Sequence, residues 1–113
     1  RWQYFHDPAP HVARLGTTTL TEVNHQMTSW GGMQIMGATA RDLGFRGYMP
    51  ELCGPELGIW WGGVYLRQRL NKTKTVEEAL ATYNGGPGEL ADGRIDNMSY
   101  VKGVLGYYRE LLQ

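Results

Sequence analysis

Apolar residues recur at helical spacing along much of the chain, and no stretch alternates apolar and polar residues for long enough to demand a strand. From residue 56 onward, Ile59, Gly63, Leu66 and Leu70 fall on one helical face, so this segment is predicted to be the longest and most buried helix. A terminal helix is predicted from a similar stripe, formed by Val101, Val104, Leu105, Tyr108 and Leu112. The pattern predicts a mainly α fold. A small β element is allowed near the N-terminal arm or within residues 88–97.

Two threonine–glutamate pairs mark further helix starts. Thr19 and Glu22 fit a capping box, in which hydroxyl and carboxylate satisfy exposed backbone N–H groups, and a short helix should follow to about Met27. Residues 75–78 repeat this pattern and predict a helix that ends at the glycines of residues 85–88.

Glycines and prolines divide the rest of the chain. A helix is predicted over residues 37–43, with Gly44 as its left-handed stop. The glycines at 62 and 63 are expected to let another helix pack closely. Residues 1–18 have no sustained period, so we predict an irregular arm with one helical turn.

Length and composition narrow the class of protein. A chain of 113 residues allows one compact domain with a modest core, so we predict a single domain over residues 1–113. It opens on Arg1 with no export signal and is interpreted as an internal fragment of a longer protein. No apolar run is long enough for a membrane span.

Charge and chemistry-bearing residues exclude several partners. Lys and Arg number 11, as do Asp and Glu, so there is no basic excess to attract nucleic acid. Three histidines without metal-ligand spacing predict no metal, and nothing indicates a cofactor. The single Cys53 cannot form an internal disulfide and is interpreted as a small buried thiol without a role. Trp and Tyr outnumber Phe, which favours rings with a polar handle that suit sugar contacts.

Two blocks carry a resemblance to a known family. They read SWGGMQIMGATA at residues 29–40 and ALATYNGGPG at residues 79–88. The first resembles the G-L-M-Q-I-M-x-x-T-A block of the SLT-type lytic transglycosylases, and the second resembles their A-L-A-A-Y-N-x-G-x-G block, in matching order and separation. Residues 29–45 are closest to phage-type members, which read S-W-G-L-M-Q-V-M-G-x-T-A-R-x-L-G-F. The resemblance covers about residues 29 to 105 and implies a lysozyme-like helical domain.

The resemblance also implies a reaction. Members of the family cleave the β-1,4 bond between MurNAc and GlcNAc in peptidoglycan, using one glutamate as acid and then as base. The C6 hydroxyl of the sugar closes a 1,6-anhydro ring, so a second carboxylate is dispensable. Protonation of the leaving oxygen requires a carboxylic acid that an apolar pocket keeps neutral.

The position of this acid departs from the family pattern. In the family it stands before the first block in a Glu-Ser pair, and this sequence contains no such pair. In phage-type members the glutamate is followed by N-P-x-A-x-R-Y-E-P, and residues 1–3 resemble R-Y-E. The acid is therefore predicted to lie a few residues upstream of Arg1. The alternative is Glu22, the only carboxylate between Asp7 and Gln34, although its place in a capping box gives it a structural task.

The resemblance implies that the glycan is bound by Met33, Gln34, Tyr83, Asn84 and Tyr100. The Gln34 amide offers both a donor and an acceptor, which suits sugar hydroxyls and N-acetyl groups. Structural alternatives remain open for three of these residues: burial for Met33, helix capping for Asn84, and a place outside the cleft for Tyr100. Core packing is also an alternative to sugar stacking for the neighbouring Trp30.

Two classes of function remain. In the first, the domain is a lytic transglycosylase that opens the cell wall locally, carried by a phage virion or located in the bacterial periplasm. In the second, it is an inactive peptidoglycan-binding or structural virion module. A goose-type lysozyme, which hydrolyses the same bond, is the runner-up among enzymes. The expected partners are peptidoglycan glycan strands and, in a virion, other virion or tail proteins.

Overall fold

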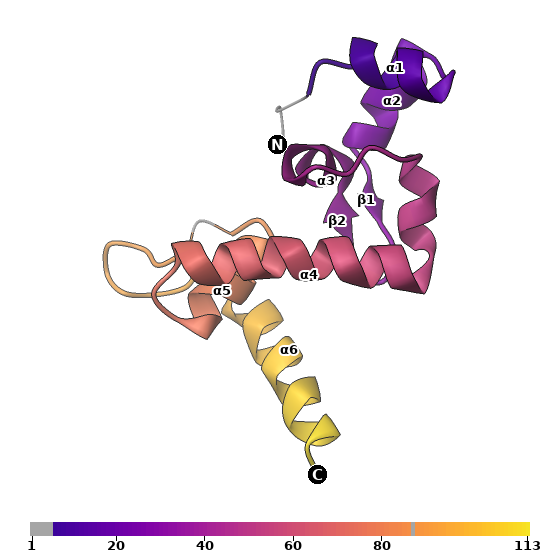
Figure 1. The fold of residues 1–113 in the computed structure, drawn as a ribbon. Coiled ribbons are helices and arrows are strands. Elements are labelled where there is room, and N and C mark those ends of the chain that lie inside the picture. The colour runs from indigo at the N-terminus through magenta and orange to yellow at the C-terminus, as the bar shows by residue number, and fades with distance from the viewer. Residues whose placement is uncertain (1–5, 87) are drawn as a thin grey trace. The chain divides into compact units, whose positions relative to one another are not determined.

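The computed structural model describes residues 6–86 and 88–113, which form helices and one small antiparallel sheet (Figure 1). The mainly α class predicted from the sequence is confirmed. By contact, the chain divides into two compact units, Arg1–Tyr65 and Leu66–Gln113. In chain order the elements are α1 (Ala9–Leu15), α2 (Thr19–Gln26), β1 (Ser29–Trp30), β2 (Ile35–Met36), α3 (Gly37–Leu43), the 3₁₀ helix η1 (Met49–Cys53), α4 (Pro55–Lys72), α5 (Val76–Tyr83) and α6 (Met98–Leu111).

The predicted N-terminal arm is more regular than its sequence suggested. Residues 1–5 lie outside the described part of the chain, but α1 spans seven residues instead of a single turn. Its first turn contains Pro10, which is tolerated there because the first N–H groups of a helix have no partner within the helix. Only Val12 and Leu15 supply large apolar side chains in this segment. The apolar periodicity of the sequence is therefore too weak to predict the helix.

Helix α2 begins as predicted, but its cap differs. The N-cap is Thr18, whose hydroxyl accepts a hydrogen bond from the backbone N–H of Thr21 at 3.1 Å. The expected box of Thr19 and Glu22 is therefore displaced by one residue. Glu22 is 1% exposed and turns into the unit instead of capping the helix.

The sheet is a hairpin that lies inside the first family block, not near the arm as allowed above. Ser29 pairs with Met36 and Trp30 with Ile35. Gly31 in the connecting loop has a φ of 75°, and a Cβ there would collide with the backbone carbonyl of Leu52. A side chain at this position would thus push the hairpin away from η1.

The core of the first unit is apolar and small. Ile35, Ala40, Phe45, Met49 and Leu52 are buried together, with Trp30, Leu43, Trp61 and Tyr65 packed around them. Helix α3 covers residues 37–43 and ends at Gly44, as predicted. Cys53, expected to be buried, is exposed.

Helix α4 is the longest, as predicted, but its buried face was predicted wrongly. The fully buried positions are Gly58 and Gly62, whereas Ile59 is 64% exposed. Gly62 does not admit a neighbouring helix; a Cβ there would meet the side chain of Met33. Small residues on the inner face carry no apolar signal, which explains the wrong assignment.

The second unit is built on α5 and α6. Leu80, Ala81 and Val101 form its core, and Leu66, Val104 and Leu105 pack against them. Tyr108 and Leu112, predicted on the apolar face of α6, are exposed. An isolated bridge pairs Glu89 with Ile95, within the 88–97 region where a β element was allowed.

Of the second predicted capping box, the hydrogen bond to the threonine hydroxyl is confirmed, whereas the glutamate carboxylate has other partners. The Thr75 hydroxyl accepts from the backbone N–H of Glu78 at 3.0 Å. The Glu78 carboxylate accepts instead from the N–H groups of Lys74 and Glu89, at 3.1 and 2.9 Å. These hydrogen bonds lower the pKa of Glu78 and attach the loop after α5 to the start of that helix.

Candidate functional site

The hairpin loop of the first unit presents Gln34 in an unusual backbone conformation. Gln34 has a φ of 52°, the only positive value for a residue other than glycine among those described. Such a conformation costs a non-glycine residue about 1–2 kcal/mol, and strain of this kind clusters at functional sites. The side chain is exposed, and its Nε2 donates to the carbonyl oxygen of Gly31 at 2.8 Å. The amide oxygen is thereby turned away from that carbonyl.

Met33 and Trp30, which lie in the same hairpin as Gln34, have structural contacts. Met33 is half-buried against Gly62 of α4. The indole N–H of Trp30 donates to the carbonyl of His25 at 2.9 Å, and its ring meets the His25 ring edge-on at 5.1 Å. Trp30 therefore joins the hairpin to the end of α2, in favour of the packing alternative.

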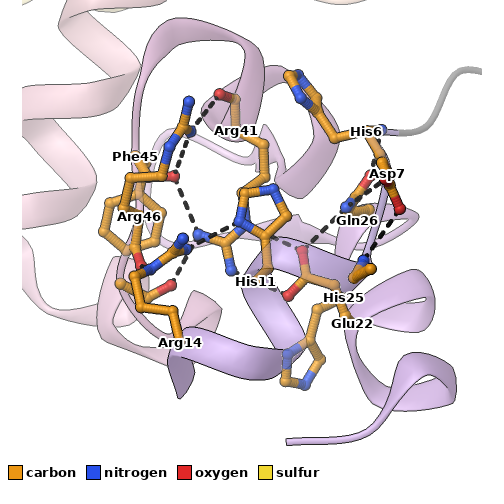
Figure 2. A network of polar contacts seen from close by, with 12 residues as sticks. His6, Asp7, His11, Arg14, Glu22, His25, Gln26, Arg41, Phe45 and Arg46 are labelled. Carbon is orange, nitrogen blue, oxygen red and sulfur yellow. Dashed lines mark hydrogen bonds and ion pairs between the residues drawn. The ribbon is translucent and has the colours of Figure 1, made fainter. Parts of the chain in front are cut away.

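A buried ion pair joins α2 to α3. Arg41 is 0% exposed; its Nε and Nη2 donate to the two carboxylate oxygens of Glu22 at 2.9 and 3.0 Å. Its Nη1 donates to the carbonyl of Phe45 at 3.0 Å (Figure 2). The same Nη1 donates to the carbonyl of Gly47 at 2.8 Å. This two-pronged geometry satisfies a guanidinium that burial has removed from water.

The same network reaches the N-terminal segment. Gln26 donates through Nε2 to Glu22 at 2.9 Å, and its Oε1 accepts from the backbone N–H of His6 at 2.8 Å. Nε2 of His6 also lies 3.5 Å from Oδ1 of Asp42. The segment that enters the fold at His6 is thus held by the side chain that also supports the buried pair.

His11 is a buried neutral member of this cluster. Its Nδ1 lies 2.8 Å from Nη2 of Arg14, which can only donate, so Nδ1 accepts and the ring proton sits on Nε2. Burial first, and then the charge of Arg41, lower the pKa of His11. A proton on this ring would add a cation beside Arg14 and Arg41.

Glu22, the alternative candidate for the catalytic acid, differs from a general acid in its protonation state and in its exposure. Burial alone raises the pKa of Glu22, but the hydrogen bonds from Arg41 and Gln26 and the Arg41 charge outweigh it and lower the pKa. The carboxylate is therefore held ionised and out of solvent, whereas the family chemistry needs a protonated group that touches the sugar.

The second unit places Tyr83 and Asn84 at the C-terminal end of α5. Tyr83 is half-buried as the last helical residue, and Asn84 is the exposed C-cap. Asn97, immediately before α6, donates from Nδ2 to the carbonyl of Ala81 at 3.0 Å and to Oδ1 of Asn84 at 3.2 Å. Tyr100 is half-buried against the Leu80–Ala81–Val101 cluster, which favours packing.

Each unit therefore groups its own candidates: Met33 with Gln34 in the first, and Tyr83 with Asn84 in the second. Sequence reasoning missed Arg41 and Asn97. A basic residue within a run of small apolar residues marks Arg41 as a candidate for burial, because an arginine on the inner face of a helix needs a counter-charge. No sequence signal singles out Asn97, which lies in a polar loop.

The described ranges show neither a cluster of metal ligands nor a membrane-spanning helix. No three His, Cys, Asp or Glu side chains within residues 6–86 and 88–113 are arranged to hold a metal ion. None of the helices in those ranges is long and apolar enough to cross a membrane.

Comparison with known proteins identifies the family of the chain. No solved structure matches the chain. A family model, the transglycosylase SLT domain, matches residues 13–100, a range that includes the hairpin loop, the buried pair and the end of α5. Because this match covers most of the 113 residues, the chain belongs to the transglycosylase SLT domain family, lytic transglycosylase-like domains that act on peptidoglycan.

Proposed function

We propose that this domain is the glycan-binding body of a peptidoglycan lytic transglycosylase that cleaves the MurNAc–GlcNAc β-1,4 bond and leaves 1,6-anhydro ends. The observation that carries the proposal is the family match over residues 13–100, which contains both sequence blocks. The strained backbone of Gln34 inside the first block supports a binding role there.

In this proposal Met33 and Gln34 of the hairpin loop are glycan-binding residues of the first unit, and Tyr83, Asn84 and Tyr100 are glycan-binding residues of the second unit. Amides and tyrosines suit a neutral glycan, and the equal numbers of basic and acidic residues fit such a partner. The catalytic acid stands upstream of Arg1, because Glu22 is occupied by Arg41 and Gln26.

The place of action follows from the substrate. A glycan-cleaving domain of this size suits local opening of a cell wall, either from a phage virion, beside other virion or tail proteins, or in the bacterial periplasm. The similarity of residues 29–45 to phage-type members favours the virion.

Binding is tested on the 113-residue chain by calorimetric titration with chitooligosaccharide. Gln34→Ala and Tyr83→Ala should each weaken binding by about 1 kcal/mol, because a polar group of the complex loses its partner. Gln113→Ala and Tyr107→Ala, at exposed positions at the C-terminus, are the matched controls and should leave binding unchanged. A large loss of thermal stability with unchanged affinity would make Gln34 and Tyr83 structural residues.

Catalysis is tested by digestion of purified peptidoglycan with this chain and with one extended upstream through a Glu-Ser pair. Loss of general acid catalysis costs about 10²–10⁴ in rate, so only the longer chain should release anhydro products, lighter by one water than hydrolysed ones. Hydrolysed products from the longer chain would indicate a goose-type lysozyme instead.

One observation favours the second candidate function, a binding or structural module without catalysis. The only carboxylate between Asp7 and Gln34 is locked in a buried pair. If the extended chain binds glycan but releases no product, the module is supported. If the 113-residue chain cleaves at the rate of the longer one, the acid lies within residues 1–113. Glu22→Gln then tests whether Glu22 is that acid and should abolish cleavage if it is.

A further inference from the structure

We propose that Asn97 is a positioning residue that fixes the side-chain amide of Asn84, so that Asn84 offers a hydrogen-bond donor to the acetamido carbonyl of the glycan. The inference rests on the proposed glycan-binding function and deepens it. It concerns only the loop between α5 and α6 in the second unit.

The geometry places one amide group between two acceptors. Nδ2 of Asn97 lies 3.0 Å from the carbonyl oxygen of Ala81 and 3.2 Å from Oδ1 of Asn84. Ala81 is a fully buried core residue of α5, so its carbonyl is a fixed point. Asn97 thus ties the end of α5 to the start of α6.

The orientation of both amides follows from the Ala81 carbonyl. A backbone carbonyl can only accept, so the end of the Asn97 amide that faces it must be the NH₂ group. The same NH₂ group faces Asn84, which must therefore turn its own oxygen toward Asn97. The NH₂ group of Asn84, an exposed residue, is left facing away from Asn97.

The other end of the Asn97 amide has no partner among the described residues that sets its orientation. Its Oδ1 is buried and accepts no hydrogen bond from the described residues. It lies against Gly86, where a Cβ would collide with it. A reversed amide would place this oxygen against the Ala81 carbonyl, so two acceptors would face each other. Asn97 is therefore held in one orientation by the backbone.

This orientation selects the ligand group. An outward N–H pair matches an acceptor, and the carbonyl oxygen of an N-acetyl group is such an acceptor on an otherwise neutral sugar. The ammonium group of a de-N-acetylated sugar can only donate and would face the Asn84 donors without a partner. The loop is thus expected to discriminate between acetylated and deacetylated glycan.

The test is calorimetric titration of the 113-residue chain with N-acetylated chitotetraose and with its de-N-acetylated counterpart. Asn97→Asp keeps the shape of the side chain but replaces the donor with an acceptor, so Asn84 should reverse. The preference for the acetylated sugar should fall about fivefold or more, the worth of one hydrogen bond. Asn71→Asp adds the same charge at an exposed position of the second unit and should keep the preference.

A double-variant cycle separates positioning from general stabilisation. In an Asn84→Ala background, Asn97→Asp should cause no further loss of preference, although it still removes the hydrogen bond to Ala81. Asn97→Ala serves as a second variant if Asn97→Asp fails to fold, and it should reduce the preference less than Asn97→Asp because Asn84 is then released rather than reversed.

The outcomes distinguish the two proposals. If the wild-type chain binds neither sugar, the glycan-binding function fails and the inference fails with it. If the wild-type chain prefers the acetylated sugar and the folded Asn97 variants keep that preference, only the role of Asn97 is overturned. A shift in melting temperature alone, without a change in preference, would make Asn97 a purely structural residue.

Discussion

The two units of this domain hold their loops in place by different chemistry. The buried polar or charged residues of the described chain all lie in the first unit: His11, Glu22, Gln26 and Arg41. The second unit has an apolar core of Leu80, Ala81 and Val101, and exposed or half-buried amide and carboxylate groups anchor its loop.

The difference has consequences for specificity and for pH dependence. A buried ion pair adds little net stability compared with apolar side chains of similar size, but the loss of one partner is costly because the other charge remains buried. The polar side chains of the first unit therefore have one stable arrangement, around Arg41. The free energy of unfolding of this unit should depend on protonation. The second unit relies mainly on apolar packing, which is insensitive to pH, and the contribution of the Glu78 carboxylate, whose pKa is lowered, should be lost only as the pH falls below 4.5.

The largest expected effect breaks the charged core. Glu22→Ala leaves Arg41 buried without a counter-charge and should reduce the free energy of unfolding by about 3–5 kcal/mol, measured by urea denaturation. Glu77→Ala, at an exposed acidic position in the first turn of α5, is the control and should cost much less.

A double variant refines this prediction. Glu22→Leu with Arg41→Met replaces the pair by apolar side chains of similar volume and should recover much of the loss. A cost below about 1 kcal/mol for Glu22→Ala would contradict the central role of the ion pair.

A smaller effect is expected from the apolar core of the second unit. Leu80→Ala removes a side chain packed against Ala81 and Val101 and should cost about 2–3 kcal/mol in urea denaturation. Leu70→Ala, at an exposed position on α4, is the matched control. The cost of Leu80→Ala should be equal at neutral and mildly acidic pH; a strong pH dependence would remove the contrast between the units.

The smallest effect concerns the pH dependence of the first unit. Because the pKa of His11 is lowered in the fold from 6.5, the unfolded chain binds more protons just below that pH. Stability should therefore be full above pH 6.5 and should fall as the pH drops toward the folded pKa, because protonation brings a cation against Arg14 and Arg41.

The comparison for this prediction is His11→Asn, which retains an acceptor near Arg14 but does not titrate. Melting curves across mildly acidic pH should show a flatter profile for the variant than for the wild type. Below pH 4.5 the Glu22 contribution is lost in turn, as protonation breaks its pairing with Arg41, so both proteins should weaken there. Identical profiles above that range would exclude His11 as the titrating group.

Sequence reasoning predicted the elements whose signals are local. Residues 37–43 with the Gly44 stop, and the helices that begin near Thr19 and after Thr75, follow from turn and cap chemistry that neighbouring residues supply, although the first cap is Thr18. It failed for α1 and for the inner face of α4, where few large apolar residues or only glycines mark the buried side. The hairpin was misplaced because strands of two residues are too short to show a period.

By itself the sequence determined the mainly helical class and the resemblance to SLT-type lytic transglycosylases, because these depend on periodicity and on residues in fixed order. The glycan-binding roles of Met33, Gln34, Tyr83, Asn84 and Tyr100 remain predictions. Only the tertiary structure decided that Glu22 is bound by Arg41, nineteen residues away in the chain, and that Asn97 donates a hydrogen bond to Asn84. Such contacts depend on which side chains the folded backbone brings within hydrogen-bonding distance, and no local pattern encodes that distance.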